Sequence, residues 1–334
     1  MGISGLCPKA VHSIYTTFAL MIQYLKHREI DFRKWDDCIG HSINTYVYAC
    51  SWYLNIVAGE WDALVETKDG NYQRVFPLPY RKKAGIKYVY QPPFTQQLGL
   101  FTRLLQGNEK LNDFLNALPR EFKLVELNLN KYHIPKNISG ISISENRNLE
   151  LELNRDYERI YANYSTNLKR NLKKAQKHNL QVLPTIKPEE LIRLFRENKG
   201  NALHAYSAED YQRLGRLMYA MIQMGKGRIY AVSSAENNLL AAAFFAEDKG
   251  RSIFLFSGLS AEGRDKAAMP FLVDAFIREH SGSDRILDFE GSNNDSLARF
   301  YGSFGAAEFK YYSIRRAHFS PPAKLIFWLY KKLR

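Results

Sequence analysis

The sequence predicts an α/β protein (mixed α+β) of two tandem halves, each a mixed, mostly antiparallel sheet flanked by helices. Three observations predict this class. At 334 residues the chain is too long for one ordinary domain and comfortable for two. Strand-like and helix-like stretches alternate along the chain. Stretches 86–130 and 252–292 repeat one order of strand, turn, helix and strand, although no strict sequence period relates them.

The first half is expected at 21–148, after an extension of residues 1–20 that shows no strong partner pattern. A short strand begins at Met21, and a helix begins near Asp31, whose carboxylate suits the N-cap position. An Asp-Gly pair at 69–70 lies between two strand-like runs and predicts a hairpin. The remaining predicted elements are a strand at 86–94, a helix at 109–122 and a strand at 123–130.

The second half is expected at 149–317 and opens with one long helix at 155–179, dense in Lys and Arg. A strand and two helices precede a three-strand meander, and a loop at 261–266 then leads into a helix at 267–280 whose apolar face must pack on the sheet. A strand, a helix and a last strand complete this half. The basic amphipathic segment 318–334 is expected as a helix docked on the body, in preference to peripheral contact with a membrane.

The most specific local pattern is SLARFYGSFGA at 296–306, where Tyr301 stands four residues before the glycine that ends a helix. This pattern, with the order meander, helix, strand, helix, strand, resembles the GNAT N-acyltransferase fold. The duplicated halves, with QPPFTQQLG at 91–99 and LKRNLKKAQK at 168–177, resemble the FemABX branch of aminoacyl and peptidyl transferases and its bacterial relatives. The resemblance implies two tandem GNAT-like domains, the first of them degenerate, and an acyltransferase activity.

CoA-using GNAT proteins carry a glycine-rich loop after the third meander strand, and its N–H groups hold the pyrophosphate. The sequence departs from this pattern, because an alanine stands in place of the inner glycine and Met269 replaces the final small residue. A Cβ at either place hinders the approach of the backbone to a phosphate. Acyl-CoA and aminoacyl-tRNA both remain possible donors, and the departure favours aminoacyl-tRNA. The residues that the resemblance assigns to cofactor binding are Ser257, Gly258, Gly263, Arg264, Lys266 and Ala267.

Three residues are candidates for catalysis. Asp288 and Glu290 occupy alternate positions of one predicted strand and so should share a face, where two close carboxylates raise the pKa of one of them, as a general base or ammonium anchor requires. Pairing with a basic side chain such as Arg264 or Arg299 is the alternative. The GNAT resemblance implies that Tyr301 is the general acid for the leaving group, and a core tyrosine is the alternative.

The candidate substrate-binding residues lie in three segments. The basic helix presents a cluster of cations without interleaved acids, as a phosphate-rich partner such as tRNA requires, although a solvated face explains it equally well. Amides in the turn after 86–90 could orient an acceptor, and turn hydrogen bonds are the alternative. The residues concerned are Lys169, Arg170, Lys173, Gln91, Gln96 and, after the strand of the two carboxylates, Ser292.

Charge and cysteine content narrow the partners only in part. The net charge of +13 fits an anionic partner such as CoA, tRNA or an anionic lipid surface and does not choose among them. The three cysteines show no CxxC spacing and no paired histidines, so neither a metal site nor a disulfide framework is predicted and the cytoplasm is the default location. No stretch reaches the roughly 20 apolar residues needed to span a bilayer.

The sequence therefore predicts an enzyme that moves an acyl or aminoacyl group from acyl-CoA or aminoacyl-tRNA to a small-molecule or peptide amine. The site is expected in the second half, with acceptor recognition shared across the two halves. The alternative is a catalytically silent GNAT-like protein that binds a nucleic acid or a cell-wall fragment.

Overall fold

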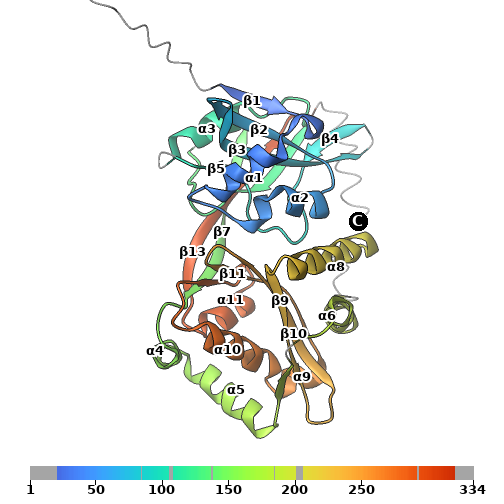
Figure 1. Ribbon diagram of the computed structural model, residues 1–334, viewed down its shortest axis with the longest axis vertical. Helices are drawn as coiled ribbons and strands as arrows, with labels where there is room; N and C mark the ends of the chain where they lie inside the picture. The colour runs from blue at the N-terminus through green and yellow to red at the C-terminus, as the bar shows by residue number, and fades with distance from the viewer. Residues whose placement is uncertain are drawn as a thin grey trace, which may run out of the picture.

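The computed structural model describes residues 21–319, apart from 84, 105–107, 137, 184, 201–205 and 292. It has two bodies, one above the other, joined by a pair of long strands (Figure 1). The predicted extension 1–20, almost all of the predicted terminal helix 318–334 and the candidate residue Ser292 lie outside the described residues.

The first half forms as its local sequence signals predict. The Asp31 carboxylate accepts hydrogen bonds from the N–H groups of Arg33 (3.0 Å) and Lys34 (3.1 Å), which confirms the N-cap. Asp69 and Gly70 both have positive φ, and they form the predicted hairpin turn. The elements are β1 (Ile22–Leu25), η1 (His27–Glu29), α1 (Phe32–Gly40), η2 (Val47–Ala49), α2 (Ser51–Val57), β2 (Trp61–Lys68), β3 (Asn71–Lys83), β4 (Ile86–Val89), β5 (Phe101–Thr102), α3 (Asn108–Asn116) and β6 (Leu124–Asn128).

The second half contains the predicted meander, in which the third, fourth and fifth strands of this half pair antiparallel in chain order. Its elements are β7 (Ile141–Glu152), α4 (Tyr157–Ala162), α5 (Thr166–Lys177), β8 (Gln181–Leu183), α6 (Pro188–Phe195), η3 (Arg196–Gly200), α8 (Ala208–Gln223), β9 (Gly227–Ser233), β10 (Leu239–Asp248), β11 (Arg251–Leu259), α9 (Ala261–Asp265), α10 (Ala268–His280), β12 (Ile286–Asp288), α11 (Asp295–Gly302) and β13 (Ala307–Ala317).

Two predicted elements of this half are wrong. The single helix at 155–179 is two helices, because the Ser165 hydroxyl accepts the N–H of Leu168 (3.2 Å) and starts α5 afresh after α4. The predicted loop 261–266 is largely the helix α9, which Ser260 caps in the same way through the N–H of Gly263 (2.9 Å). Both errors arise from serine caps inside stretches that the apolar pattern does not divide.

One hydrogen-bonded path connects the strands of both halves, in the order β1-β2-β3-β4-β6-β13-β7-β12-β11-β10-β9-β8. At its centre β13 pairs with β7 from Ala307↔Glu150 to Arg316↔Ile141, and these two strands run between the bodies in Figure 1. The other edge of β13 pairs with β6 of the first half. The boundary predicted at 148/149 falls within β7, so the two halves share strands and no linker separates them.

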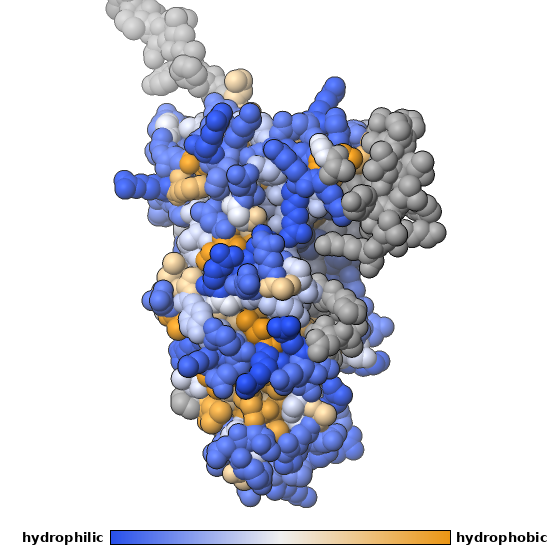
Figure 2. Space-filling view, turned by 90° about the vertical axis from the view of Figure 1, so that its right-hand side faces the viewer, coloured by the Kyte–Doolittle hydropathy of each residue, from blue (hydrophilic) through white to orange (hydrophobic). Residues whose placement is uncertain are grey.

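The second-half sheet is covered on both faces. On one face α6 and α8 pack against β9, β10 and β11, and their buried residues join the core of the first half. On the other face α10 packs against β9 and β10 with α5 beside it, and Met269, Leu272, Val273, Phe276 and Ile277 are buried as predicted. The face that carries α6 and α8 is largely hydrophilic, with hydrophobic residues gathered in its middle and lower parts (Figure 2). Within the described chain, no helix has the length and apolar character to cross a membrane.

Candidate active site

The site begins where two neighbouring strands separate. β11 and β12 are parallel partners only from Arg251↔Ile286 to Ile253↔Asp288. Beyond that point β11 continues to Leu259 beside β10, whereas the chain after β12 turns away through Glu290 and Gly291, both with positive φ. The two strands therefore separate beyond Ile253 and Asp288.

A pocket of about 340 Å³ lies beside this separation. It is enclosed by β11, the α9–α10 segment, α11, α5 and the end of α6, so all of its walls belong to the second half. Its lining includes the predicted residues Ser257, Gly263, Arg264, Ala267 and Tyr301. It also includes Lys174 of the predicted basic cluster, and Asn171, Phe195, Asn198 and Met269, which were not candidate site residues.

Tyr301 occupies the wall of the pocket formed by α11. Its ring stacks on Phe289 (centroids 4.8 Å apart) and meets Phe254 edge-on (6.2 Å), and the side chain is 8% exposed. Burial raises the pKa of Tyr301, and the nearby charge of Glu290 adds to the rise. The Tyr301 hydroxyl forms no hydrogen bond with a described residue. It stays protonated at neutral pH, as a proton donor must.

Glu290, the residue after Phe289, makes contact with the first half. The Tyr48 hydroxyl, on the fully buried η2 segment, donates a hydrogen bond to its Oε1, and the Gln96 side-chain amide donates to its backbone carbonyl. Burial raises the pKa of Glu290 to about 8; the bond from Tyr48 opposes this rise, and the charge of Asp288 adds to it. A carboxyl group with this pKa can accept a proton near neutral pH.

The charge of Glu290 reaches tyrosines of both halves. It contributes, after burial, to the raised pKa of side chains from the first half, from the chain before α8, from the pocket wall and from the central strand pair. These tyrosines are Tyr48, Tyr53, Tyr206, Tyr301 and Tyr311. Glu290 is therefore placed between the second-half pocket and the aromatic surface of the first half.

Asp288 differs from Glu290 in its surroundings. It is fully buried, and its Oδ2 pairs with Nη1 of Arg251 (2.8 Å), which also pairs with Glu150 (2.9 Å). Lys131 pairs with the same Glu150. Burial raises the pKa of Asp288, and the Arg251 guanidinium opposes this. Two cations and two carboxylates thus balance inside the core, where an uncompensated charge is costly.

The expectation that the two carboxylates share one strand face is wrong. β12 ends at Asp288, and Glu290 adopts a left-handed backbone (φ +54°), so strand alternation does not continue to it. The two residues remain close because the N–H of Glu290 donates to Asp288 Oδ1 (2.9 Å). Asp288 does pair with an arginine, but this is Arg251, and neither Arg264 nor Arg299 takes that place.

Gly291 holds this turn against β7. With φ at +47°, a Cβ there would lie 2.1 Å from the backbone oxygen of Arg147 and 2.3 Å from Cα of Asn148. We expect Gly291→Ala to destabilise the protein by about 3 kcal/mol or more, since backbone strain and overpacking add. Gly302→Ala is the matched control, because its nearest contact would be 3.8 Å away in a helix. Equal melting temperatures for the two variants would contradict this account of the turn.

The segment expected to hold a pyrophosphate has a different form. Gly263 packs against β10, where a Cβ would lie 2.3 Å from the Leu240 carbonyl oxygen, and Gly258 packs against α6 in a similar way. Lys266 pairs with Glu262 (2.7 Å) and does not line the pocket. Ala267 has φ +57° at the start of α10, the backbone region that glycine adopts most readily.

The basic helix α5 divides its cations between two surfaces. Lys174 lines the pocket, whereas Lys173 lines a separate groove between α5 and α10. Lys169 bonds the carbonyl of Ala162 (2.9 Å) at the end of α4, and Arg170 is exposed. Of the predicted trio, none lines the pocket.

Gln91 and Gln96 act differently. Gln91 is a turn residue: its amide donates to the Thr95 carbonyl (2.6 Å), and its oxygen accepts the N–H of Asn128 (2.9 Å). Gln96 instead donates a hydrogen bond to Glu290 of the other half.

Tyr48 was not predicted as a site residue, because an aromatic residue within an apolar stretch is normally interpreted as a core residue. Among the described residues, no cluster of three His, Cys, Asp or Glu side chains is arranged to hold a metal.

These features define a class. The meander, the separated strands and the repeated halves joined through β7 and β13 form a tandem GNAT-like fold of the FemABX type.

Comparison with solved structures gives the same fold. The chain is similar to FemX (TM-score 0.60, 12% identity, 87% of this chain and 96% of that one). It is also similar to a Bacteroides thetaiotaomicron protein of unknown function (0.54, 10%, 90% and 100%). A third similar structure is the C-terminal domain of a protein described as a lysylphosphatidylglycerol synthetase from Agrobacterium fabrum (0.51, 10%, 89% and 94%). No protein-family model and no curated protein sequence matches the chain.

Proposed function

We propose that the protein is an enzyme that transfers an acyl or aminoacyl group from an activated donor to the nitrogen of an amine acceptor. The observation that carries the proposal is the placement of Glu290 and Tyr301 next to Phe289, where β11 and β12 separate. Tyr301 stacks on Phe289, and Glu290 follows Phe289 in the chain and accepts a hydrogen bond from Tyr48 of the first half. The donor carbonyl would enter from the second-half pocket, and the amine would approach from the first half. Incubation with charged tRNA or acyl-CoA and a panel of amines, followed by mass spectrometry for an amide product, tests the activity.

The chemistry follows from two proton transfers. Glu290, with a pKa of about 8, takes a proton from the acceptor ammonium, whose own pKa is similar in an α-amine. The nitrogen then attacks the donor carbonyl, the new C–N bond forms, and the bond from the carbonyl to the leaving atom breaks. Tyr301 gives its hydroxyl proton to that leaving atom, and the second proton that the nitrogen must lose to become an amide returns to the Tyr301 oxygen. Asp288 is held by Arg251 and has no part in the transfer beyond fixing the turn.

Aminoacyl-tRNA suits the second-half pocket better than CoA. The α10 N-terminus offers a pyrophosphate few donors, since Ala267 carries a Cβ and Pro270 has no N–H. By contrast, Lys174 and Arg264 line the pocket, the exposed Arg170 lies one helical turn before Lys174 on α5, and Lys173 adds positive charge in the separate groove beside α5. Such an open cationic surface fits a phosphate chain that continues beyond the pocket.

We expect titration calorimetry to give weak binding of acetyl-CoA and stronger binding of tRNA that falls steeply as salt rises, because displaced counterions drive the latter. Neutralising Arg170 and Lys173 together should make the slope of log binding constant against log salt concentration smaller in magnitude by about two. Tight acetyl-CoA binding without affinity for tRNA would reverse the choice of donor and leave the acyltransferase proposal intact.

A further inference from the structure

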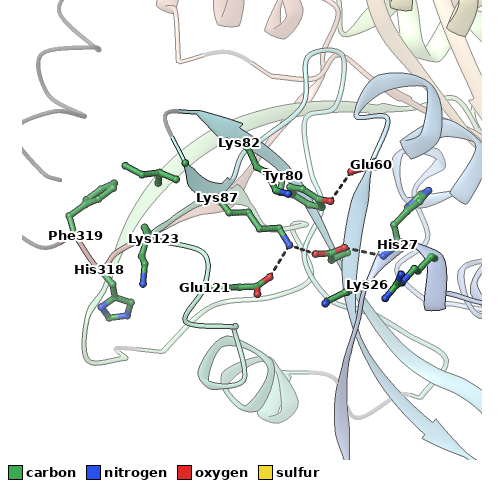
Figure 3. A pocket seen from close by; sticks show the side chains of 14 residues that line it. Lys26, His27, Glu60, Tyr80, Lys82, Lys87, Glu121, Lys123, His318 and Phe319 are labelled. Carbon is green, nitrogen blue, oxygen red and sulfur yellow. Dashed lines mark hydrogen bonds and ion pairs between the residues drawn. The ribbon is translucent and has the colours of Figure 1, made fainter.

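A second pocket, of about 760 Å³, lies in the first half and has no residue in common with the candidate active site. β4, the end of β3, the chain before β6 and the chain after β13 form one side, and the η1 segment forms the other (Figure 3). Its walls are mainly charged. The backbone N–H of His318 bonds the carbonyl of Lys123 (2.8 Å), and the N–H of Lys123 bonds that of Lys87 (3.0 Å), so three chain segments bring basic residues to one rim.

The acidic side chains of this pocket already have partners. Lys87 pairs with Asp62 (2.6 Å) and Glu121 (2.8 Å), and the dashed lines in Figure 3 mark both contacts. Glu60 accepts the hydroxyl hydrogen bond of Tyr80 (2.8 Å). These contacts hold the carboxylates in the wall.

The remaining cations of the wall are exposed. Lys26, Arg28, Lys82 and Lys123 form no ion pair with a described residue. Five Lys and Arg side chains face three carboxylates in this lining, so the pocket carries an excess of positive charge. Its recognition chemistry is that of a phosphate-bearing anion.

The sequence beyond the pocket indicates which anion. Phe319 lines the rim, and residues 320–334 follow it as SPPAKLIFWLYKKLR. This stretch joins an apolar run, 325–330, to Lys331, Lys332 and Arg334. Apolar side chains next to cations suit the interface of an anionic membrane, whereas an RNA offers no place to bury the apolar run.

We propose that this first-half pocket binds the phosphate headgroup of an anionic lipid, and that the protein docks on membrane surfaces through this end of the molecule. The proposal is independent of the transferase activity, because the two pockets lie in different halves. A lipid bound here acts as an anchor and takes no part in the transfer reaction.

The test is co-sedimentation of the full chain with phosphatidylcholine vesicles that contain or lack phosphatidylglycerol. We expect binding only to the anionic vesicles, and a roughly 25-fold loss in the double variant Lys82→Gln/Lys123→Gln, since each cation near an anionic surface contributes about fivefold. The control Lys177→Gln/Arg193→Gln removes the same charge from exposed positions of the second half. An equal loss of vesicle binding in both double variants would show that binding depends on net charge alone. That result would contradict the proposed lipid site in this pocket.

Two further measurements distinguish a membrane lipid from other phosphate-bearing ligands of the pocket. Titration with soluble glycerol phosphate should show weak binding that the Lys82/Lys123 variant loses. Tight binding of glycerol phosphate without vesicle binding would contradict the membrane proposal and show that the pocket binds a soluble phosphate compound. Loss of tRNA binding in this variant, with vesicle binding unchanged, would assign the pocket to a nucleic acid. Melting temperatures equal to the wild type would show that both double variants are folded.

Discussion

Replacement of Tyr301 by phenylalanine is expected to lower the rate of acyl transfer by about 10²–10⁴-fold, the usual effect of losing a proton donor. The substitution removes one oxygen and keeps the ring that stacks on Phe289. Because the hydroxyl has no hydrogen-bond partner among the described residues, its loss should change the melting temperature little. The measurement is a single-turnover assay with the donor identified by the product screen.

Tyr311→Phe is the matched control. Tyr311 is also 8% exposed, and the Glu290 charge contributes to its raised pKa, but it lies on β13 and does not line the second-half pocket. It should keep wild-type turnover. A Tyr301→Phe variant with wild-type turnover would end the assignment of Tyr301 as the acid and favour a core tyrosine.

Glu290→Gln is expected to lower kcat/KM by about 10²–10⁴-fold and to abolish part of its pH dependence. In the wild type, kcat/KM should rise through an apparent pKa of about 8 as Glu290 loses its proton. Tyr48→Phe supplies a second readout. The Tyr48 hydroxyl lowers the pKa of Glu290, so removing this hydroxyl should shift the rise of kcat/KM to higher pH. A profile that stays flat near pH 8 in the wild type would exclude Glu290 as the base.

The same group links stability to pH with a defined sign. The pKa of Glu290 rises from 4.5 to about 8 on folding, so between these values the folded chain holds a proton that the unfolded chain has released. Stability therefore falls as pH rises through this window. Glu290→Gln removes the effect, and we expect its melting temperature to exceed that of the wild type more at about pH 9 than at about pH 5.

The elements and much of the pocket could be predicted from the sequence, because they depend on local signals. Three such signals depend only on residues close by in the sequence: the Asp31 N-cap, the Asp-Gly turn at 69–70 and the apolar face of α10. The structure contains all three as expected. Of the seven candidates for the cofactor site and the general acid, which the GNAT-like order of elements suggested, five line one pocket, whereas Gly258 is a packing residue and Lys266 pairs with Glu262.

The charge partners could not be predicted, because they join segments far apart in the chain. Arg251 meets Glu150 across 101 positions, and Tyr48 meets Glu290 across 242. The left-handed backbone at Glu290 separates two carboxylates that strand alternation would have placed together. Such a conformation in a non-glycine residue has no sequence signal of its own, and it is maintained by the packing of Gly291 against β7.

The position of β13 has a consequence for the order in which the molecule forms during synthesis. This strand is made last among the described elements, yet it lies between β6 and β7 and pairs with both. Pairings with β6 span up to about 190 positions of sequence, and such non-local contacts slow folding because the chain entropy lost in closing the loop precedes the gain. Until Ala317 has left the ribosome, β6 and β7 each present an open edge that invites association with other chains. A nascent chain halted before Ala307 should therefore remain aggregation-prone, although nine-tenths of the protein has already been made.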